Sequence, residues 1–237
     1  MVENEEIPNI EDLSHEILPE DYPTYDLTFK IIVIGDSFVG KSCLTTKGTK
    51  NMFEDSYNAT VGFEFVTSNI KVQDKVCKMQ IWDTCGQEVY RSLITNFYRN
   101  SSLAILVYSI DNYESYENLD LWLKELKTFS SPDAKVFLIG NKCDLDHKRK
   151  VTTENGEYYK SENKLDFFME ASAKTGFNAQ NVFVEAAKHL YIDFLKYKDR
   201  IDKSRSSSVH SSIIKKGSLS QSVKPTVTPE EKKGCAC

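Results

Sequence analysis

A glycine-containing segment at residues 35–42, GDSFVGKS, combines the residue types that bind phosphate. It directly follows a β-branched apolar run at residues 31–34, which is typical of a strand. Its glycines permit tight turns whose backbone amides point at phosphate oxygens, and the following helix presents its positive N-terminal end to the same charge. A simple turn between strand and helix would explain the glycines alone. The complete pattern instead indicates a loop that binds a nucleoside triphosphate.

Three side chains in and near this loop suit a triphosphate and its metal. Lys41 would neutralise the outer phosphates, and the Ser42 hydroxyl would bind a magnesium ion that also takes waters and phosphate oxygens as ligands. A second motif, residues 82–88, follows an apolar strand and brings Asp83 to the same sheet edge, where it can hold the magnesium through a water. The D-x-x-G pattern alone is common in turns, so its position after a strand carries this assignment.

Two later motifs indicate which base is bound. Residues 141–144, NKCD, follow a buried strand and end in Asp144, whose carboxylate can accept hydrogen bonds from the N1 and N2 donors of guanine. Adenine lacks this pair of donors, and sites built on such pairing discriminate by roughly 10⁴ or more. Residues 171–174, ASAK, would set backbone amides and Lys174 beside the base, although alone they would be only a helix-start loop. Together the motifs predict a guanine-nucleotide site.

Hydrophobic patterns predict the elements that hold these motifs. Nearly unbroken apolar runs at 103–108 and 136–139 are typical of parallel strands buried on both faces. Residues 61–72 and 76–82, with a turn at 74–75, predict a hairpin. Apolar residues at helical spacing predict core helices at 119–129 and 182–194. This alternation favours an α/β domain with a mostly parallel sheet, helices on both faces and a ligand crevice at the carboxyl ends of the strands.

Composition divides the 237-residue chain into three parts. Acidic residues without any Lys or Arg crowd positions 3–26, so we expect residues 1–28 to be a disordered acidic arm. Residues 29–198 form the domain, and residues 199–237 form a flexible tail rich in Ser, Lys, Pro and Thr. The basic run at 147–150 is expected to be a solvated loop. The acidic start and the absence of a long apolar run predict a cytosolic protein.

The four motifs, in this order, resemble those of the Ras superfamily of small GTPases over residues 29–197. Within it, residues 61–65 (VGFEF), 97–99 (FYR) and the terminal Cys-x-Cys resemble the Rab branch. The resemblance implies an α/β P-loop GTPase fold with a mostly parallel six-stranded sheet flanked by helices on both faces. It also implies a magnesium-dependent switch that cycles between GTP and GDP and regulates vesicle trafficking.

The resemblance assigns further roles by position. Thr60 matches a magnesium ligand that senses the γ-phosphate, Gly86 senses it from the other side, and Gln87 is the catalytic residue that positions the attacking water. The implied metal ligands are Ser42, Thr60 and Asp83. The implied nucleotide-binding residues are Asp36, Ser37, Phe38, Val39, Gly40, Lys41, Ser42, Cys43, Phe53, Thr60, Gly86, Asn141, Lys142, Asp144, Ser172, Ala173 and Lys174.

The resemblance also implies protein partners. No arginine in the motifs is placed to enter the site, so hydrolysis should be slow, on the order of 10⁻⁴ s⁻¹, and should depend on a GTPase-activating protein. An exchange factor, a GDP-dissociation inhibitor or escort protein, and effectors complete the expected set, with a monomeric chain and no nucleic acid. Phe65, Trp82 and Phe97 match an aromatic triad that effectors read, although these rings could simply pack together.

The C-terminus is expected to carry the membrane anchor. In the Rab branch a terminal Cys-x-Cys, here Cys235 and Cys237, receives two geranylgeranyl groups. Two chains matter because one lipid gives only marginal binding. The alternative is an unmodified thiol pair. The expected location is the cytosolic face of an intracellular membrane, with a soluble cytosolic pool.

Two departures from the family pattern bear on activity and stability. Cys85 replaces a usual alanine beside Gly86 and Gln87, where overpacking of about 1–3 kcal/mol would impair hydrolysis. Gly48 lies in a polar stretch after the phosphate loop and predicts a short or frayed helix. A nucleotide-binding scaffold with weak hydrolysis is therefore the alternative function. A P-loop kinase or ATPase is a further alternative, against which Asp144 speaks.

Overall fold

The structure, a computed structural model, describes residues 7–53, 63–84 and 97–210, with side chains through residue 201. The chain divides into two units, Met1–Tyr197 and Lys198–Cys237, and the boundary falls within helix α6 (Ala179–His210). None of the helices in the described ranges combines the length and apolarity needed to span a bilayer.

Helix α6 corrects part of the expected tail. Composition predicts a flexible tail from residue 199, but α6 continues to His210. Residues 199–210 contain no glycine or proline, the residues that most strongly oppose a helix. The low apolar content of residues 199–210 therefore does not end the helix.

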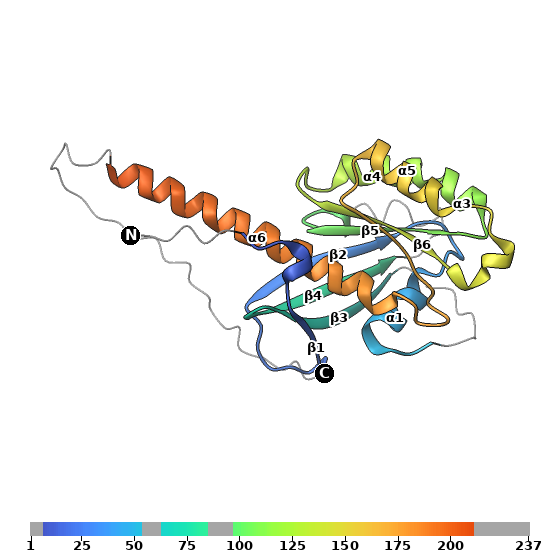
Figure 1. Cartoon of the computed structure of the whole chain (residues 1–237), viewed down its shortest axis with the longest axis horizontal. Coiled ribbons are helices and arrows are strands. Elements are labelled where there is room, and N and C mark those ends of the chain that lie inside the picture. Colours follow the sequence, from blue (N-terminus) through green and yellow to red (C-terminus); the bar gives the residue numbers. More distant parts are fainter. Residues whose placement is uncertain (1–6, 54–62, 85–96, 211–237) are drawn as a thin grey trace, which may run out of the picture. The chain divides into compact units, whose positions relative to one another are not determined.

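Within the described residues, strands form one seven-stranded sheet in the order β1-β3-β4-β2-β5-β6-β7 (Figure 1). Strand β3 is antiparallel to both β1 and β4, and the remaining neighbours are parallel, so the expected mostly parallel α/β sheet is confirmed. The strands are β1 (His15–Leu18), β2 (Leu27–Ile34), β3 (Phe63–Val72), β4 (Lys75–Thr84), β5 (Leu103–Ser109), β6 (Lys135–Asn141) and β7 (Phe167–Glu170).

Helices cover both faces of this sheet (Figure 1). Alternate residues of β2 enter different cores: Ile31 packs in the cluster that holds α1 and α6, and Ile32 packs in the cluster that holds α4 and α5. A strand buried on both faces must be apolar at successive positions, which explains its unbroken run. The remaining elements are α1 (Lys41–Lys50), α3 (Tyr113–Glu117), α4 (Leu119–Phe129), α5 (Thr153–Asn163), η1 (Ile10–Asp12) and η3 (Cys143–Lys148).

The predicted hairpin is present as β3 and β4, with its turn one residue earlier than expected. Val72 pairs with Lys75, so Gln73 and Asp74 form the turn. Gln73 adopts φ 55°, and its backbone N–H donates to Ser14 O over 3.0 Å. The turn is thus also a contact with the N-terminal segment.

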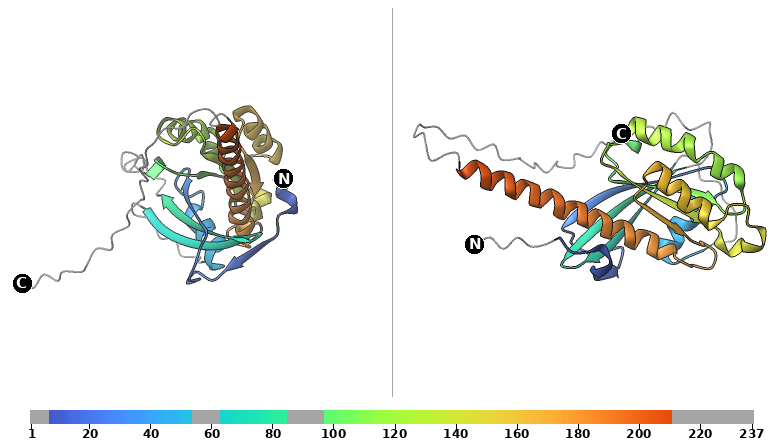
Figure 2. Two further views of the ribbon diagram at one scale, coloured as in Figure 1. Left: turned by 90° about the vertical axis from the view of Figure 1, so that its left-hand side faces the viewer. Right: turned by 45° about the horizontal axis from the view of Figure 1, so that its top comes forward.

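The prediction of a disordered arm is wrong for residues 10–12 and 15–18, which form η1 and β1. Strand β1 pairs antiparallel with β3 from His15–Val72 to Leu18–Asn69 and adds a seventh strand to the expected six. Figure 2 shows this dark blue segment along the outer edge of the sheet. Without β1, strand β3 would be an edge strand with unpaired backbone groups, and pairing with β1 satisfies some of them.

Side chains of this arm also reach the core. Leu13 is 3% exposed, and Ile7 and Ile10 pack against the core cluster that contains α1 and α6. The Asn69 amide donates to the carbonyls of Pro19 and Glu20, both over 3.0 Å. Charge composition predicted disorder because it ignored these few apolar side chains and the open strand edge beside them.

Replacing Leu13 by Ala is expected to lower the free energy of unfolding by about 2–3 kcal/mol, because it leaves a cavity under a docked segment. Urea denaturation of the full chain measures this change. The control is Ile17→Ala, which removes a 40% exposed side chain from the same arm and should cost less than about 1 kcal/mol. Equal, small effects of both variants would show that the arm does not dock in solution.

Helix α1 is not shortened by Gly48. The helix runs over 10 residues and buries Leu44, Thr45 and Gly48. A Cβ at Gly48 would lie 2.3 Å from Phe183 Cε2 and 2.5 Å from Ala179 O. Glycine therefore permits close packing of α1 on α6, and the expectation of a short or frayed helix is not what the structure shows.

Candidate functional site

The predicted phosphate-binding loop connects β2 to α1, and two of its positions have backbone conformations that glycine adopts most readily. Gly35 has φ 138°, and Gly40, the residue before the helix, has φ 90°. The Lys41 ammonium donates to Gly35 O over 2.9 Å and to Asp36 O over 2.8 Å, and this lysine is 5% exposed. The loop thus wraps around the buried Lys41 ammonium, the group predicted to neutralise phosphate.

The side chain of Asp36 is occupied by the start of α4. Asn118 Nδ2 donates to Asp36 Oδ2 and Trp122 Nε1 donates to Asp36 Oδ1, both over 2.7 Å. The predicted role of Asp36 in nucleotide binding therefore falls to its backbone, while its carboxylate fastens the loop to α4.

Phe38 holds an unusual backbone conformation in this loop. Its φ is 65°, in the left-handed region that residues with a Cβ adopt at a cost of roughly 1–2 kcal/mol, and its side chain is 68% exposed. Strain of this kind persists only where the surroundings determine the backbone. The shape of the loop is thus imposed by its connections to β2 and α1 rather than by the preference of Phe38.

Asp83, at the end of β4, has the environment of a cation ligand. It is 1% exposed, and neither carboxylate oxygen has a hydrogen-bond partner within the described residues. Burial raises the pKa of Asp83 to about 6, against the opposing influence of the nearby Ser42 hydroxyl and Lys41 ammonium. A buried carboxylate without a partner fits a hard cation such as Mg²⁺, so Ser42 and Asp83 suit the predicted metal. The third predicted ligand, Thr60, lies outside the described residues.

Replacing Asp83 by Asn is expected to separate stability from metal binding. Without nucleotide, the variant should be more stable than the parent by about 1–3 kcal/mol, because a buried, unpartnered charge is removed. Its nucleotide affinity should lose most of its dependence on Mg²⁺. Urea unfolding and nucleotide titrations with and without EDTA measure the two effects, and an unchanged magnesium dependence would contradict the assignment.

Asn141 joins the phosphate loop to the fourth motif. Its Nδ2 donates to Val39 O over 2.8 Å and to Gly40 O over 3.3 Å, and its Oδ1 accepts from the Ala173 N–H over 3.2 Å. Asn141 is 1% exposed, so these bonds form away from water. One buried side chain therefore sets the distance between the predicted phosphate and base sites.

Asp144 is oriented by the fourth motif. The Ser172 hydroxyl donates to Asp144 Oδ1 over 2.5 Å and accepts from the Thr175 N–H over 3.1 Å. The Cys143 N–H donates to Ala171 O over 3.1 Å, which holds the two loops together along the backbone. The carboxylate of Asp144 is thereby fixed and retains capacity to accept the hydrogen bonds of a base.

Other predicted residues lie nearby with less defined roles. Lys142 is half-buried with φ 63°, Lys174 is exposed, and Cys43 is half-buried. Phe53, predicted to flank the base, packs partly against the core cluster of α1 and α6. Three predicted residues, Thr60, Gly86 and Gln87, lie outside the described part of the chain, as do Cys85, Cys235 and Cys237.

The aromatic triad is part of a larger cluster. Trp82 lies with its ring centroid 5.0 Å from Phe65 and 5.1 Å from Phe97, and Phe63 lies 5.2 Å from Trp82 and 4.5 Å from Phe97. Phe63 and Phe65 remain 45% and 48% exposed. The rings therefore both pack together and form an open apolar surface. Phe63 was missed, although its position two residues before Phe65 on one strand places both on the same face.

The chain is similar in sequence to known proteins over most of its length. The model of the Ras family matches residues 30–192. The Ras-related protein RABA1b of Arabidopsis thaliana is 46% identical over 167 residues, covering 70% of this chain and 77% of the relative. RABA1g of the same plant is 37% identical over 214 residues, covering 89% and 94%. Rab11B of Nicotiana tabacum is 42% identical over 167 residues, covering 70% and 76%.

Proposed function

This chain belongs to the Rab branch of the Ras family of small GTPases, and from that premise we propose how its site binds and hydrolyses GTP. As a member it is a GTPase, converting GTP to GDP and phosphate, in a family that acts in vesicle trafficking. The observation that carries the site proposal is the bonding of Asn141 to both the phosphate loop and Ala173. It supports a single ligand that reaches from the loop at 35–42 to Asp144.

Each part of the proposed site has one task. Backbone amides of residues 36–43 and the Lys41 ammonium bind the phosphates, and Asp144 accepts hydrogen bonds from guanine. Ser42, Asp83 and Thr60 would hold Mg²⁺, which would supply positive charge to stabilise the negative charge of the phosphates. Gln87 orients the attacking water, while Thr60 and Gly86 respond to the γ-phosphate and so link hydrolysis to the conformation of their segments.

The proposed cycle depends on other proteins. Hydrolysis is slow without an activating protein that supplies an arginine, and an exchange factor replaces GDP by GTP. Effectors bind the aromatic cluster of Phe63, Phe65, Trp82 and Phe97, and the exposed rings of Phe63 and Phe65 support this role. A GDP-dissociation inhibitor or escort protein carries the chain, and lipids on Cys235 and Cys237 attach it to the cytosolic face of a membrane.

A single-turnover assay with the full-length protein tests this proposal. In the presence of Mg²⁺ we expect the protein to load GTP and not ATP, and to release phosphate at or below about 10⁻⁴ s⁻¹. Cys85→Ala should raise this rate, because a smaller side chain beside Gly86 relieves overpacking. Loading of GTP without hydrolysis in either form would favour the scaffold alternative. Equal loading of ATP would contradict the proposal.

A further inference from the structure

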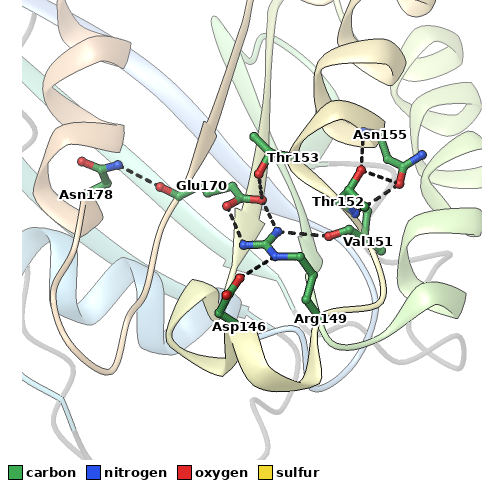
Figure 3. A network of polar contacts seen from close by, with 8 residues as sticks. All are labelled: Asp146, Arg149, Val151, Thr152, Thr153, Asn155, Glu170 and Asn178. Atoms are coloured by element: carbon green, nitrogen blue, oxygen red, sulfur yellow. Dashed lines mark hydrogen bonds and ion pairs between the residues drawn. The ribbon is translucent and has the colours of Figure 1, made fainter.

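An ion pair joins two residues that lie close in the chain to the predicted base-binding motifs. One of them, Arg149, belongs to the basic run at 147–150 that is predicted to be a solvated loop. Arg149 donates from Nη1 to Glu170 Oε1 over 2.6 Å and from Nη2 to Glu170 Oε2 over 3.0 Å (Figure 3). Their side chains are only 20% and 15% exposed. Two parallel bonds between a guanidinium and a carboxylate fix both position and angle. The prediction of a solvated loop is therefore wrong for Arg149, since its side chain pairs with Glu170 and is largely buried.

Further bonds make this pair the centre of a network (Figure 3). Arg149 Nη1 also donates to Val151 O over 3.0 Å, and Nε donates to Asp146 Oδ1 over 2.7 Å. The Thr153 hydroxyl donates to Glu170 Oε1 over 3.2 Å. The network therefore ties the end of η3 and the start of α5 to the end of β7.

The pair lies next to the residues that meet the base. Glu170 directly precedes the fourth motif at 171–174, and Arg149 follows η3, which contains Asp144. The beginning of η3 is held to the fourth motif by the bond from Cys143 N–H to Ala171 O. Arg149 and Glu170 hold the other end of the same segment, so two fastenings enclose Asp144.

We propose that Arg149 and Glu170 are positioning residues for guanine recognition, holding Asp144 and the Ser172 hydroxyl at the spacing that the base requires. This inference rests on the proposed guanine site. With the pair broken, η3 is held only at its start, by the bonds from Cys143 N–H to Ala171 O and from the Ser172 hydroxyl to Asp144, so Asp144 can shift relative to the base. Hydrogen bonds of poor geometry are weak, so the base contacts lose strength while the phosphate contacts remain.

Base selectivity distinguishes this role from a merely structural one. Inosine diphosphate lacks the N2 amino group of GDP, so the ratio of their dissociation rates reports the contact of Asp144 with that group. A pair that only stabilises the fold would change the free energy of unfolding and leave this ratio unchanged. A pair that positions Asp144 must change the ratio.

The experiment measures dissociation of fluorescently labelled GDP and inosine diphosphate from the full-length protein with Mg²⁺, together with urea unfolding. Arg149→Ala should speed GDP release about tenfold, equivalent to ~1.4 kcal/mol. It should also reduce the ratio of the inosine diphosphate dissociation rate to the GDP dissociation rate at least about threefold. Arg149→Lys should fall between the parent and Arg149→Ala, because lysine keeps the charge without the bidentate geometry. Lys148→Ala, which removes a neighbouring exposed charge, should match the parent.

Each result decides the inference. If Arg149→Ala loses stability with an unchanged rate ratio, the pair is structural and the inference is overturned. If Arg149→Ala does not fold, Arg149→Lys and Glu170→Gln decide it by the same ratio. If the parent protein and Lys148→Ala both fail to bind labelled GDP, the proposed function itself fails, and the inference fails with it.

Discussion

Replacement of Asp144 by asparagine is expected to weaken GDP binding by roughly 10²–10⁴-fold. Ser172 donates its hydroxyl proton to Asp144, because a carboxylate oxygen can only accept, and the Ser172 oxygen accepts from the Thr175 N–H. An asparagine would turn its carbonyl oxygen to Ser172 and to the N1 donor of guanine, and would present its NH₂ group to the N2 donor. A charge-assisted hydrogen bond worth about 1.5–3 kcal/mol is lost, and an unsatisfied donor adds about 1–3 kcal/mol.

The same orientation predicts a gain for another base. Xanthine keeps the N1 donor but carries an oxygen acceptor at C2, which complements an amide that offers both a donor and an acceptor. Titration of Asp144→Asn with GDP and xanthosine diphosphate should therefore reverse the preference of the parent protein. Asp133→Asn, in an exposed loop before β6, is the charge-matched control and should bind GDP as the parent does. An unchanged GDP affinity in Asp144→Asn would refute the assignment of the base site.

Replacement of Gly35 by alanine should unfold much of the protein population. Gly35 has φ 138°, and its Cβ would lie 2.1 Å from Val107 O. Strained backbone costs about 1–3 kcal/mol, and overpacking adds about 1–3 kcal/mol, so we expect a loss of roughly 2–6 kcal/mol. Val107 cannot withdraw, because it lies within the paired strand β5. Loss of this size is comparable with the whole stability of a marginal domain.

Urea denaturation of the full chain measures this loss, and Gly176→Ala is the control. Gly176 also has a positive φ, 86°, but its Cβ would meet the flexible end of the Lys47 side chain, with Cε at 2.9 Å and Nζ at 3.7 Å. We expect a loss of about 1–2 kcal/mol there, from backbone strain alone. Equal losses at both positions would mean that the contact with Val107 is relieved and that the loop is less constrained than its geometry indicates.

Structural elements that depend on residues close together in the chain could be predicted from the sequence. The loop between β2 and α1, the hairpin and the buried strands follow from residues close together in the chain, and the structure confirms these elements. The order of polar motifs after successive strands also predicted that Asp83 and Asp144 lie at one sheet edge, since parallel strands end together. The contacts of Asn141 with Val39 and Ala173 show that the loop at 35–42, the third motif and the fourth motif lie together.

Features that depend on distant partners could not be predicted in this way. The acidic arm docks because an open edge of β3 and an apolar core lie beside it, and neither is visible in its own composition. Arg149, in the basic run at 147–150, forms an ion pair with Glu170, which is 21 residues away. The Asp36 carboxylate accepts hydrogen bonds from Asn118 and Trp122, which follow it by 82 and 86 residues. Each outcome is decided by a pairing between segments, and a local pattern carries no information about it.

The central claim is that one site binds the phosphates through residues 35–42 and selects guanine through Asp144. The most direct measurement is displacement of labelled GDP from the unmodified full-length protein by GDP, inosine diphosphate and ADP, with Mg²⁺ present. We predict that GDP competes best, inosine diphosphate competes less well, and ADP requires about 10⁴-fold higher concentration or more. Competition by ADP at the concentration that suffices for GDP would contradict the account.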